Sequence, residues 1–251
     1  MPRFFVRSTQ IENGVVTING DDAFHISRSL RMAAGEHITV CDMQRKEYDC
    51  LLEHFGDGQV LARILSESCC DTEPPFYARL FQALPKGDKL DTVIQKSVEC
   101  GVSEITLFES ERCVVRADRS NEAKKSERRS RIAFEAAKQC GRGIIPSINL
   151  TLSFKEAVAQ AKKADIPLFC YEGDNTLLLG KVLRKYISET NSEHIPNISI
   201  MIGSEGGFSR SEAEYAIEAG MVPIGLGKRI LRTETAAMFV LSSLVYEFEL
   251  N

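Results

Sequence analysis

The chain has 251 residues, of which 43% are hydrophobic and 26% are charged, and its net charge at pH 7 is -4. Its longest apolar runs are much shorter than the ~20 residues that cross a bilayer, and residues 1–20 lack the apolar core of a signal peptide. We therefore expect a globular, cytoplasmic protein that has no membrane partner.

The first 72 residues alternate short apolar segments with turn signals such as Asn13-Gly14 and Asn19-Gly20. This pattern is typical of a small β-barrel, with one helical turn at 22–30. The segment is net acidic, with seven Lys or Arg and eleven Asp or Glu. We expect strands at 4–6, 15–18, 37–41, 47–53 and 60–65, followed by a linker at 66–75.

From residue 77 the sequence alternates strand-like and helix-like segments. Repeated alternation of this kind predicts an α/β domain, with a mostly parallel sheet between layers of helices. The expected strands are 77–84, 105–108, 168–171, 198–202 and 221–226. The expected helices are 88–99, 120–139, 153–163, 176–188 and 233–248, together with one that follows Ser209.

Two loops stand out in the last fifty residues. The glycine-rich loop 203–208 follows the expected strand 198–202, and the loop 226–231 follows the expected strand 221–226. We expect these two strands to be adjacent in the sheet, and α/β folds bind ligands where such strands end. The sequence therefore predicts a ligand site between the two loops.

The helices beside these loops carry clear end signals. Ser209 and Glu212 form a capping box that starts a helix, and Gly220 ends it. We expect one buried face on this helix, formed by Ala213, Ala216 and Ile217. The final helix is apolar almost all round from Ala236 to Leu241, which predicts burial on every side.

Eight cysteines and four histidines are scattered without a C-x-x-C pair or the spacing of a metal site. We expect reduced thiols and no bound metal. The basic residues, in contrast, are clustered. Residues 112–142 hold ten Lys or Arg and four Asp or Glu, which makes a basic segment on an acidic protein.

The segments Gly203-Ser-Glu-Gly-Gly-Phe-Ser209 and Leu226-Gly-Lys-Arg-Ile-Leu-Arg-Thr-Glu-Thr-Ala236 resemble the signature of the RsmE family of SPOUT-class RNA methyltransferases. The resemblance covers nearly the whole chain, although Ser204 stands where the family usually has proline. It implies an S-adenosyl-L-methionine-dependent enzyme that methylates N3 of a uridine in 16S ribosomal RNA of the small subunit. It also implies a homodimer, a PUA-like β-barrel at 1–72 that binds RNA, and a SPOUT domain at 73–251 with a C-terminal trefoil knot.

The methyl donor carries a sulfonium, an adenine and a polar tail, so its site requires apolar walls and backbone hydrogen bonds. Ile202, Leu226, Ile230 and Leu231 are the expected walls, and glycines of the two loops supply the peptide groups. The resemblance and this chemistry together give the expected cofactor-binding residues: Ile202, Gly203, Ser204, Glu205, Gly206, Gly207, Gly225, Leu226, Gly227, Ile230, Leu231, Thr235 and Ala236.

Uridine N3 lies on the Watson-Crick edge, so the base must be unpaired before a methyl group can reach it. As N3 loses its proton, negative charge develops on the uracil oxygens, and a fixed cation would stabilise that charge. Arg232 is the first candidate and Arg229 the second, whereas Lys228 fits a backbone or phosphate contact better. Glu205, Glu234 or water could accept the proton. Thr233 could be catalytic or could cap the last helix.

Three further stretches resemble the family: Lys86-Gly-Asp-Lys with Gln95-Lys96, Ser110-Glu-Arg112 with Val114-Val115, and Glu135-Ala-Ala-Lys-Gln-Cys-Gly-Arg142. A charged helix is often only a solvated surface, but the resemblance favours RNA contact. The candidate RNA-binding residues are Arg3, Arg28, Arg31, Arg112, Arg128, Arg129, Arg131 and Arg142.

Two other classes of protein are alternatives. A non-catalytic RNA-binding assembly factor could keep this fold without binding the donor, but the intact glycine-rich loop and the Arg-Ile-Leu-Arg232 segment disfavour it. A nicotinamide-dependent oxidoreductase is disfavoured because no G-x-G-x-x-G follows the first strand of the α/β domain.

Overall fold

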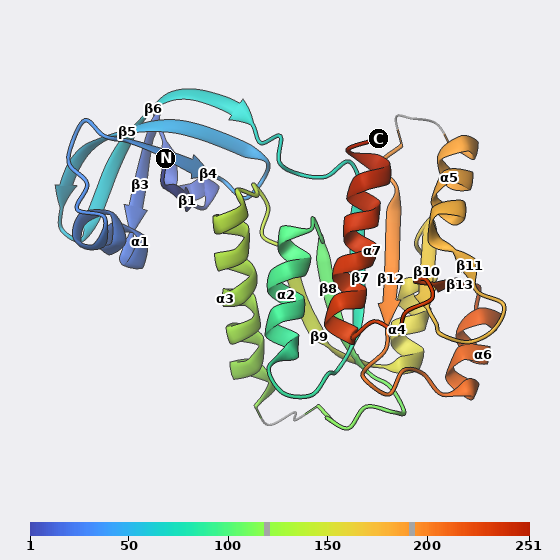
Figure 1. Ribbon diagram of the computed structural model, residues 1–251. Helices are drawn as coiled ribbons and strands as arrows, with labels where there is room; N and C mark the ends of the chain where they lie inside the picture. Colours follow the sequence, from blue (N-terminus) through green and yellow to red (C-terminus); the bar gives the residue numbers. More distant parts are fainter. Residues whose placement is uncertain (118–120, 191–193) are drawn as a thin grey trace. The chain divides into compact units, whose positions relative to one another are not determined.

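A computed structural model of the protein describes residues 1–117, 121–190 and 194–251 (Figure 1). The chain divides into two compact units. The first contains Met1–Glu73 and Ala137–Ile145, and the second contains Pro74–Ala136 and Pro146–Asn251.

The first unit is built on a six-stranded sheet in the order β1-β4-β5-β6-β3-β2. β1 and β4 are parallel, and the other neighbouring strands are antiparallel. Alternate residues such as Val16 and Ile18, or Cys50 and Leu52, are buried in one cluster because they share a face of the sheet. The strands are β1 (Arg3–Phe5), β2 (Ile11–Glu12), β3 (Val15–Asn19), β4 (His37–Cys41), β5 (Lys46–Gly56) and β6 (Gln59–Cys69).

Short helical segments complete this unit. The predicted turn at 22–30 consists of α1 (Gly20–Phe24) and a π-helical turn, η2 (His25–Ser29), which bury Ala23 and Ile26 in the same cluster. A 3-10 turn, η1 (Ser8–Gln10), was not predicted. The predicted linker at 66–75 is wrong in its first half, because β6 continues to Cys69, which pairs with Lys46 of β5.

Residues 137–145 are fixed to the end of the first unit by buried polar contacts. Arg142 is 3% exposed and forms an ion pair of 2.7 Å with Glu73. The same carboxylate accepts hydrogen bonds from the backbone N–H groups of Gly143 and Ile144. Because a buried charge is costly without its partner, this pair ties two distant stretches of chain together.

The second unit contains a seven-stranded sheet in the order β11-β13-β10-β12-β7-β8-β9, and every neighbouring pair is parallel. This confirms the predicted α/β class. Its central strands are buried, as expected for a parallel sheet covered on both faces. The strands are β7 (Tyr77–Ala83), β8 (Glu104–Glu109), β9 (Ser147–Ser153), β10 (Ile166–Cys170), β11 (Leu177–Leu178), β12 (Asn197–Ile202) and β13 (Val222–Gly225).

Helices cover this sheet. α2 and α7 pack side by side on one face, and α4 packs against β7, β8, β9 and β12 behind the sheet in the view of Figure 1. Among the described residues, no helix has both the length and the apolar character needed to cross a membrane. The helices are α2 (Lys89–Glu99), α3 (Glu122–Cys140), α4 (Phe154–Ala161), α5 (Leu179–Glu189), α6 (Arg210–Glu218) and α7 (Thr233–Phe248).

Local end signals predicted α6 and α7 well, but not their buried faces. The capping box of Ser209 and Glu212 is present, and Gly220 follows α6 with a φ of +101°. Ile217, however, is 43% exposed, so it does not share the buried face of the two alanines. α7 has the predicted bounds, but Phe239 is 42% exposed, so burial on every side is wrong.

The sequence did not predict β9 or β11. Leu177 and Leu178 were expected in a helix at 176–188, but they pair with Ile224 and Gly225 of β13, so α5 begins at Leu179. β9 is the edge strand beside β8. Residue 120, where the basic helix was expected to begin, lies outside the described residues.

Candidate active site

A cavity of about 860 Å³ lies at the carboxyl-terminal edge of the parallel sheet. Three segments at the ends of strands line it: 170–173 at β10, 202–208 at β12 and 225–233 at β13. Carboxyl ends of parallel strands share one edge of a sheet, so segments that are distant in the sequence converge there. Residues of other elements, Lys89, Arg112 and Arg210 among them, complete the lining.

The loops 203–208 and 226–231 meet in this cavity although their strands are not adjacent. β10 lies between β12 and β13 and pairs with both, so the expectation of adjacent strands is wrong. A strand from earlier in the chain thus lies between these two strands, and the local sequence pattern does not show such an order. Segment 170–173 therefore enters the site as a third loop that the sequence did not predict.

The loop 203–208 is a tight turn closed by its own backbone. The N–H of Gly207 donates to the carbonyl of Ser204 at 2.9 Å, and Gly207 has a φ of +63°. A Cβ on Gly203 would lie 3.1 Å from the Cα of Gly207. Glycine is therefore required at both positions by the turn itself, since other residues rarely adopt this φ or fit this spacing.

Thr233 fixes the start of this loop from the other side of the site. Its Oγ1 donates to the carbonyl of Gly203 at 2.7 Å and accepts from Nε2 of Gln82 at 2.8 Å. The N-cap residue of α7 is Arg232, and in the part of the chain that the structure describes no side chain caps the helix there, so the expected capping role of Thr233 is wrong. Thr233 lies in the first turn of α7, and its hydroxyl donates to the loop 203–208 instead of capping the helix.

Glu205 is held by the first residue of α2 and by the turn before it. Its carboxylate accepts from Nζ of Lys89 at 2.6 Å and from the backbone N–H of Lys86 at 3.1 Å. Partial burial raises the pKa of this carboxyl, but the bonds from Lys89 and from backbone amides outweigh that effect, so the pKa lies below its ordinary value. Glu205 is therefore a stable carboxylate and a weak base.

The second loop contributes differently from what its sequence suggested. Leu226 and Leu231 are half-buried and line the cavity, but Ile230 is 84% exposed and forms no enclosed wall. Gly227 has a φ of +103°, and a Cβ built there would meet no atom within 4 Å, so its backbone borders open space. The loop thus offers unobstructed peptide groups at Gly227.

Three cations of residues 228–232 border the cavity: Lys228, Arg229 and Arg232. All three are exposed, or nearly so, and within the described part of the chain none of these side chains forms a hydrogen bond or an ion pair. Their charges are therefore available to a ligand. Arg112 differs, because its Nη1 donates to the carbonyl of Gly206 at 3.1 Å.

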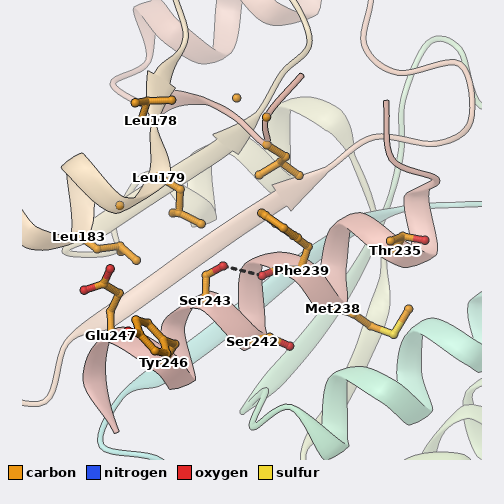
Figure 2. Close-up of a pocket in the computed structure, with 14 residues that line it drawn as sticks. Leu178, Leu179, Leu183, Thr235, Met238, Phe239, Ser242, Ser243, Tyr246 and Glu247 are labelled. Carbon is orange, nitrogen blue, oxygen red and sulfur yellow. Dashed lines mark hydrogen bonds between the residues drawn. The ribbon is translucent and has the colours of Figure 1, made fainter. Parts of the chain in front are cut away.

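A groove of about 610 Å³ adjoins the cavity and lies between α5 and α7 (Figure 2). It shares Gly225, Leu226 and Gly227 with the cavity, and its walls include Phe239 and Met238. Thr235 lines this groove and not the cavity, and its contact with the cofactor stays a prediction. Ala236 does line the cavity.

Known proteins that resemble the chain show which family it belongs to. The family described as RNA methyltransferase domain matches residues 72–245. The ribosomal RNA small subunit methyltransferase E of Bacillus subtilis is 32% identical over 100% of this chain and 98% of that protein. The chain belongs to this methyltransferase family. The resemblance noted in the sequence is thereby confirmed.

Two solved structures extend the comparison of this methyltransferase. Ribosomal RNA small subunit methyltransferase E from Neisseria gonorrhoeae, bound to S-adenosyl methionine, has a TM-score of 0.81 and 31% identity over 98% of this chain and 97% of that chain. A Legionella pneumophila methyltransferase in complex with the cofactor SAM has a TM-score of 0.81 and 32% identity over 97% and 96%.

The cavity of this methyltransferase fits such a donor. Its volume lies within the range of roughly 300–1,000 Å³ that is usual for small-molecule sites. Leu226 and Ile202 supply apolar surface, and Gly227 presents its backbone to open space. Gly225 has a different role. A Cβ there would lie 2.7 Å from Oγ1 of Thr176, so glycine at this position permits the close packing of Thr176.

The predicted RNA-binding arginines separate into buried and exposed groups. Arg142 and Arg129 are 3% and 9% exposed and are paired with Glu73 and Glu122, so their charges are neutralised within the chain, and their contact with RNA stays a prediction. Arg3 is partly buried against Glu47. The paired carboxylates explain this result, since charge counts in a sequence do not show which cations are neutralised.

The exposed arginines remain candidates in this methyltransferase. Arg28, Arg31 and Arg131 are exposed, and their side chains have no hydrogen bond or ion pair within the described ranges. Arg128 is exposed but forms an ion pair with Asp91. Asp118 and Arg119 of the basic segment lie outside the described residues.

The sequence missed several residues of the site. Tyr171, Glu172 and Thr176 enter with β10 and the segment after it, and Lys89 enters from the start of α2. Phe208 packs against Phe169, with ring centroids 4.5 Å apart. Only one signal pointed to any of them, the Lys86-Gly-Asp-Lys stretch that ends at Lys89.

Proposed function

We propose that this protein transfers the methyl group of S-adenosyl-L-methionine to N3 of a uridine in 16S ribosomal RNA of the small subunit. The observation that carries the proposal is one cavity, bordered by peptide groups of three loops and by Arg229 and Arg232, whose charges have no partner among the described residues. Relatives named as small-subunit RNA methyltransferases, one of them solved with the donor, support it.

The bound donor supplies an electrophilic methyl group, and the chain must orient an unpaired uridine beside it. Negative charge spreads to the uracil oxygens as the N3 proton leaves, and an uncompensated cation stabilises this charge. Arg232 suits the role because it precedes α7 directly and its guanidinium has no other partner among the described residues. Arg229 is the second candidate.

The proton passes to solvent water in this proposal. Glu205 is a poor acceptor because Lys89 and the Lys86 N–H stabilise its charged form. Glu234 does not line the cavity. Glu205 then has a positioning role, since it anchors the loop 203–208 to the turn before α2.

The finer architecture is part of the proposal. Residues 1–72 form a PUA-like β-barrel in this proposal, and residues 73–251 form a SPOUT domain. The last segment of the SPOUT domain passes through an earlier loop and so forms a trefoil knot. The six-stranded sheet of the first unit supports the barrel. The contact of Thr233 with Gly203 supports the knot, because it places the start of the last helix against the loop after β12.

A homodimer is also part of the proposal, with the groove between α5 and α7 as the contact surface for a second copy. The groove is mostly apolar, and Phe239 and Tyr246 on α7 are 42% and 56% exposed (Figure 2). One oxygen of Glu247 is buried without a hydrogen-bond partner among the described residues, so a donor from the partner would satisfy it. Analytical ultracentrifugation of Phe239→Asp should show monomers if this is the interface.

Mass spectrometry of ribosomal RNA from a deletion strain tests the reaction. The 3-methyluridine of 16S RNA should disappear and should return when the wild-type gene is restored. Thermal melting with S-adenosylhomocysteine tests the cavity, since a ligand that binds the native state raises the melting temperature. An unchanged 3-methyluridine content in the deletion strain, together with an unchanged melting temperature in the presence of S-adenosylhomocysteine, would indicate a non-catalytic assembly factor.

Because its substrate is ribosomal RNA in this proposal, we place the protein in the cytoplasm.

A further inference from the structure

The carboxylate of Glu212 does more than cap a helix. It is 8% exposed and accepts from the backbone N–H of Ser209 at 3.0 Å, as a capping box requires. It also accepts from the N–H of Glu111 at 2.8 Å and from Oγ of Ser110 at 3.1 Å. One buried side chain thus joins the end of the 203–208 loop to a segment about one hundred residues earlier in the chain.

That earlier segment, residues 110–116, is folded upon itself. The N–H of Cys113 donates to the carbonyl of Ser110 at 3.0 Å, and the guanidinium of Arg116 donates to the carbonyls of Ser110 and Glu111. Arg112, Val114 and Arg116 are nevertheless exposed, and Val114 is 71% exposed. The segment therefore presents two cations and an apolar side chain in a fixed arrangement.

Arg112 connects this segment to the loop 203–208. Its guanidinium donates to the carbonyl of Gly206, and its own carbonyl accepts from Oγ of Ser204 at 3.4 Å. A Cβ on Gly206 would lie 3.0 Å from the Cβ of Arg112, so the two backbones are packed as closely as glycine permits. A proline at position 204 could not make the Ser204 bond.

We propose that segment 110–116 holds the RNA strand beside the target uridine, and that Glu212 is a positioning residue that fixes this segment to the loop 203–208. The inference rests on the proposed function and adds to it the place where the substrate is held. Arg112 lines the cavity, so a phosphate bound by this segment lies at the entrance of the donor site.

The exposed chemistry of the segment favours RNA as the partner. A guanidinium has five N–H donors, and the bond to Gly206 uses only one of those of Arg112. The others can contact phosphate, and Arg116 adds a second charge to the same strand. Val114 offers an apolar surface to an unstacked base, which suits an RNA whose target nucleotide is unpaired.

A double-mutant cycle tests the assignment, with small subunits from the deletion strain as substrate. Glu212→Gln leaves either the Glu111 or the Ser209 N–H without an acceptor, and Arg112→Ala removes the charge that Glu212 positions. Each change should raise KM for the subunit about tenfold at nearly unchanged kcat. In the double variant KM should also rise about tenfold, whereas independent effects would multiply to about a hundredfold. Donor affinity should stay within about threefold, because Thr233 and Lys89 still hold the loop.

Glu156→Gln is the matched control, since Glu156 occupies the same position in the capping box of α4 but is exposed. It should not change KM. If Glu212→Gln fails to fold, Ser110→Ala removes a single bond to the carboxylate and should raise KM about threefold. Additive effects, or an unchanged KM, would overturn the inference. Should the wild type transfer no methyl group, the proposed function fails, and the same cycle in filter binding of transcribed 16S RNA still tests Glu212.

Discussion

Thr233 and Gly203, thirty residues apart in the sequence, are joined by a hydrogen bond of 2.7 Å from Oγ1 to the carbonyl oxygen. The same hydroxyl accepts from Gln82 of β7, so one buried threonine links the first strand of the second unit, the glycine-rich loop and the last helix. Loss of this hydroxyl should therefore affect both stability and the donor site.

We expect Thr233→Val to lower the free energy of unfolding by about 1–3 kcal/mol, because the carbonyl of Gly203 loses its buried donor. Donor affinity should fall as well, since the loop is no longer held at that end. Thr233→Ser keeps the hydroxyl and should behave almost as the wild type. Urea unfolding and calorimetric titration measure the two effects; a valine variant of wild-type stability would show that the bond contributes nothing.

Arg232→Ala should separate binding from chemistry. Its guanidinium has no hydrogen bond to the loops among the described residues, so donor affinity and melting temperature should stay close to wild type. The rate of methyl transfer should fall roughly 100-fold, the usual scale for one preorganised electrostatic contact. Single-turnover methylation at saturating donor measures this rate. Normal single-turnover chemistry with weakened donor binding would contradict the catalytic role.

The pKa of Glu205 gives a prediction about pH. Because this pKa is lowered in the folded protein, the carboxylate stabilises the fold above the ordinary pKa of glutamate, and the contribution is lost as pH falls through the lowered value. The difference in unfolding free energy between wild type and Glu205→Gln should be largest near neutral pH and should shrink in acid. Urea unfolding at a series of pH values checks this; a difference that grows in acid would exclude it.

Two arginines of α3 should respond oppositely to substitution. Arg131 is exposed and uncompensated among the described residues, so Arg131→Ala should leave melting unchanged and reduce the salt dependence of RNA binding by about 0.7 to 0.9 log units if it contacts one phosphate. Arg129→Ala should lower the melting temperature, since it leaves the half-buried carboxylate of Glu122 unpaired. Filter binding and thermal melting of both variants measure the two effects. A lower melting temperature for Arg131→Ala, or an unchanged one for Arg129→Ala, would contradict this division.

The features that depend on neighbouring residues were predictable from the sequence. Ser209 and Glu212 are three residues apart, and their capping box predicted the start of α6. The loops at 203–208 and 226–231 were recognised from their glycines. The order of the strands was not predictable in this way, because the insertion of β10 between β12 and β13 depends on pairing between segments that are far apart in the chain.

The same distinction applies to the site. Glu212 was recognised as a cap but not as the acceptor for Ser110 and Glu111, since those bonds cross about one hundred residues. The ion pairs of Arg129 with Glu122 and of Arg142 with Glu73 were not predicted, because charge counts do not show which acidic side chain neutralises which cation. Contacts between side chains and distant segments were thus the part of the site that the sequence did not predict.

The ion pair between Glu73 and Arg142 has a consequence for dissecting this protein. The chain leaves the first unit after Glu73, returns at Ala137 and leaves again after Ile145, so the unit is encoded by two separate parts of the gene. A fragment that stops at residue 73 retains the buried carboxylate and loses the guanidinium and the two amides that satisfy it. That fragment should be unstable when it is expressed alone. A stable isolated first unit requires residues 137–145 to be joined to residues 1–73.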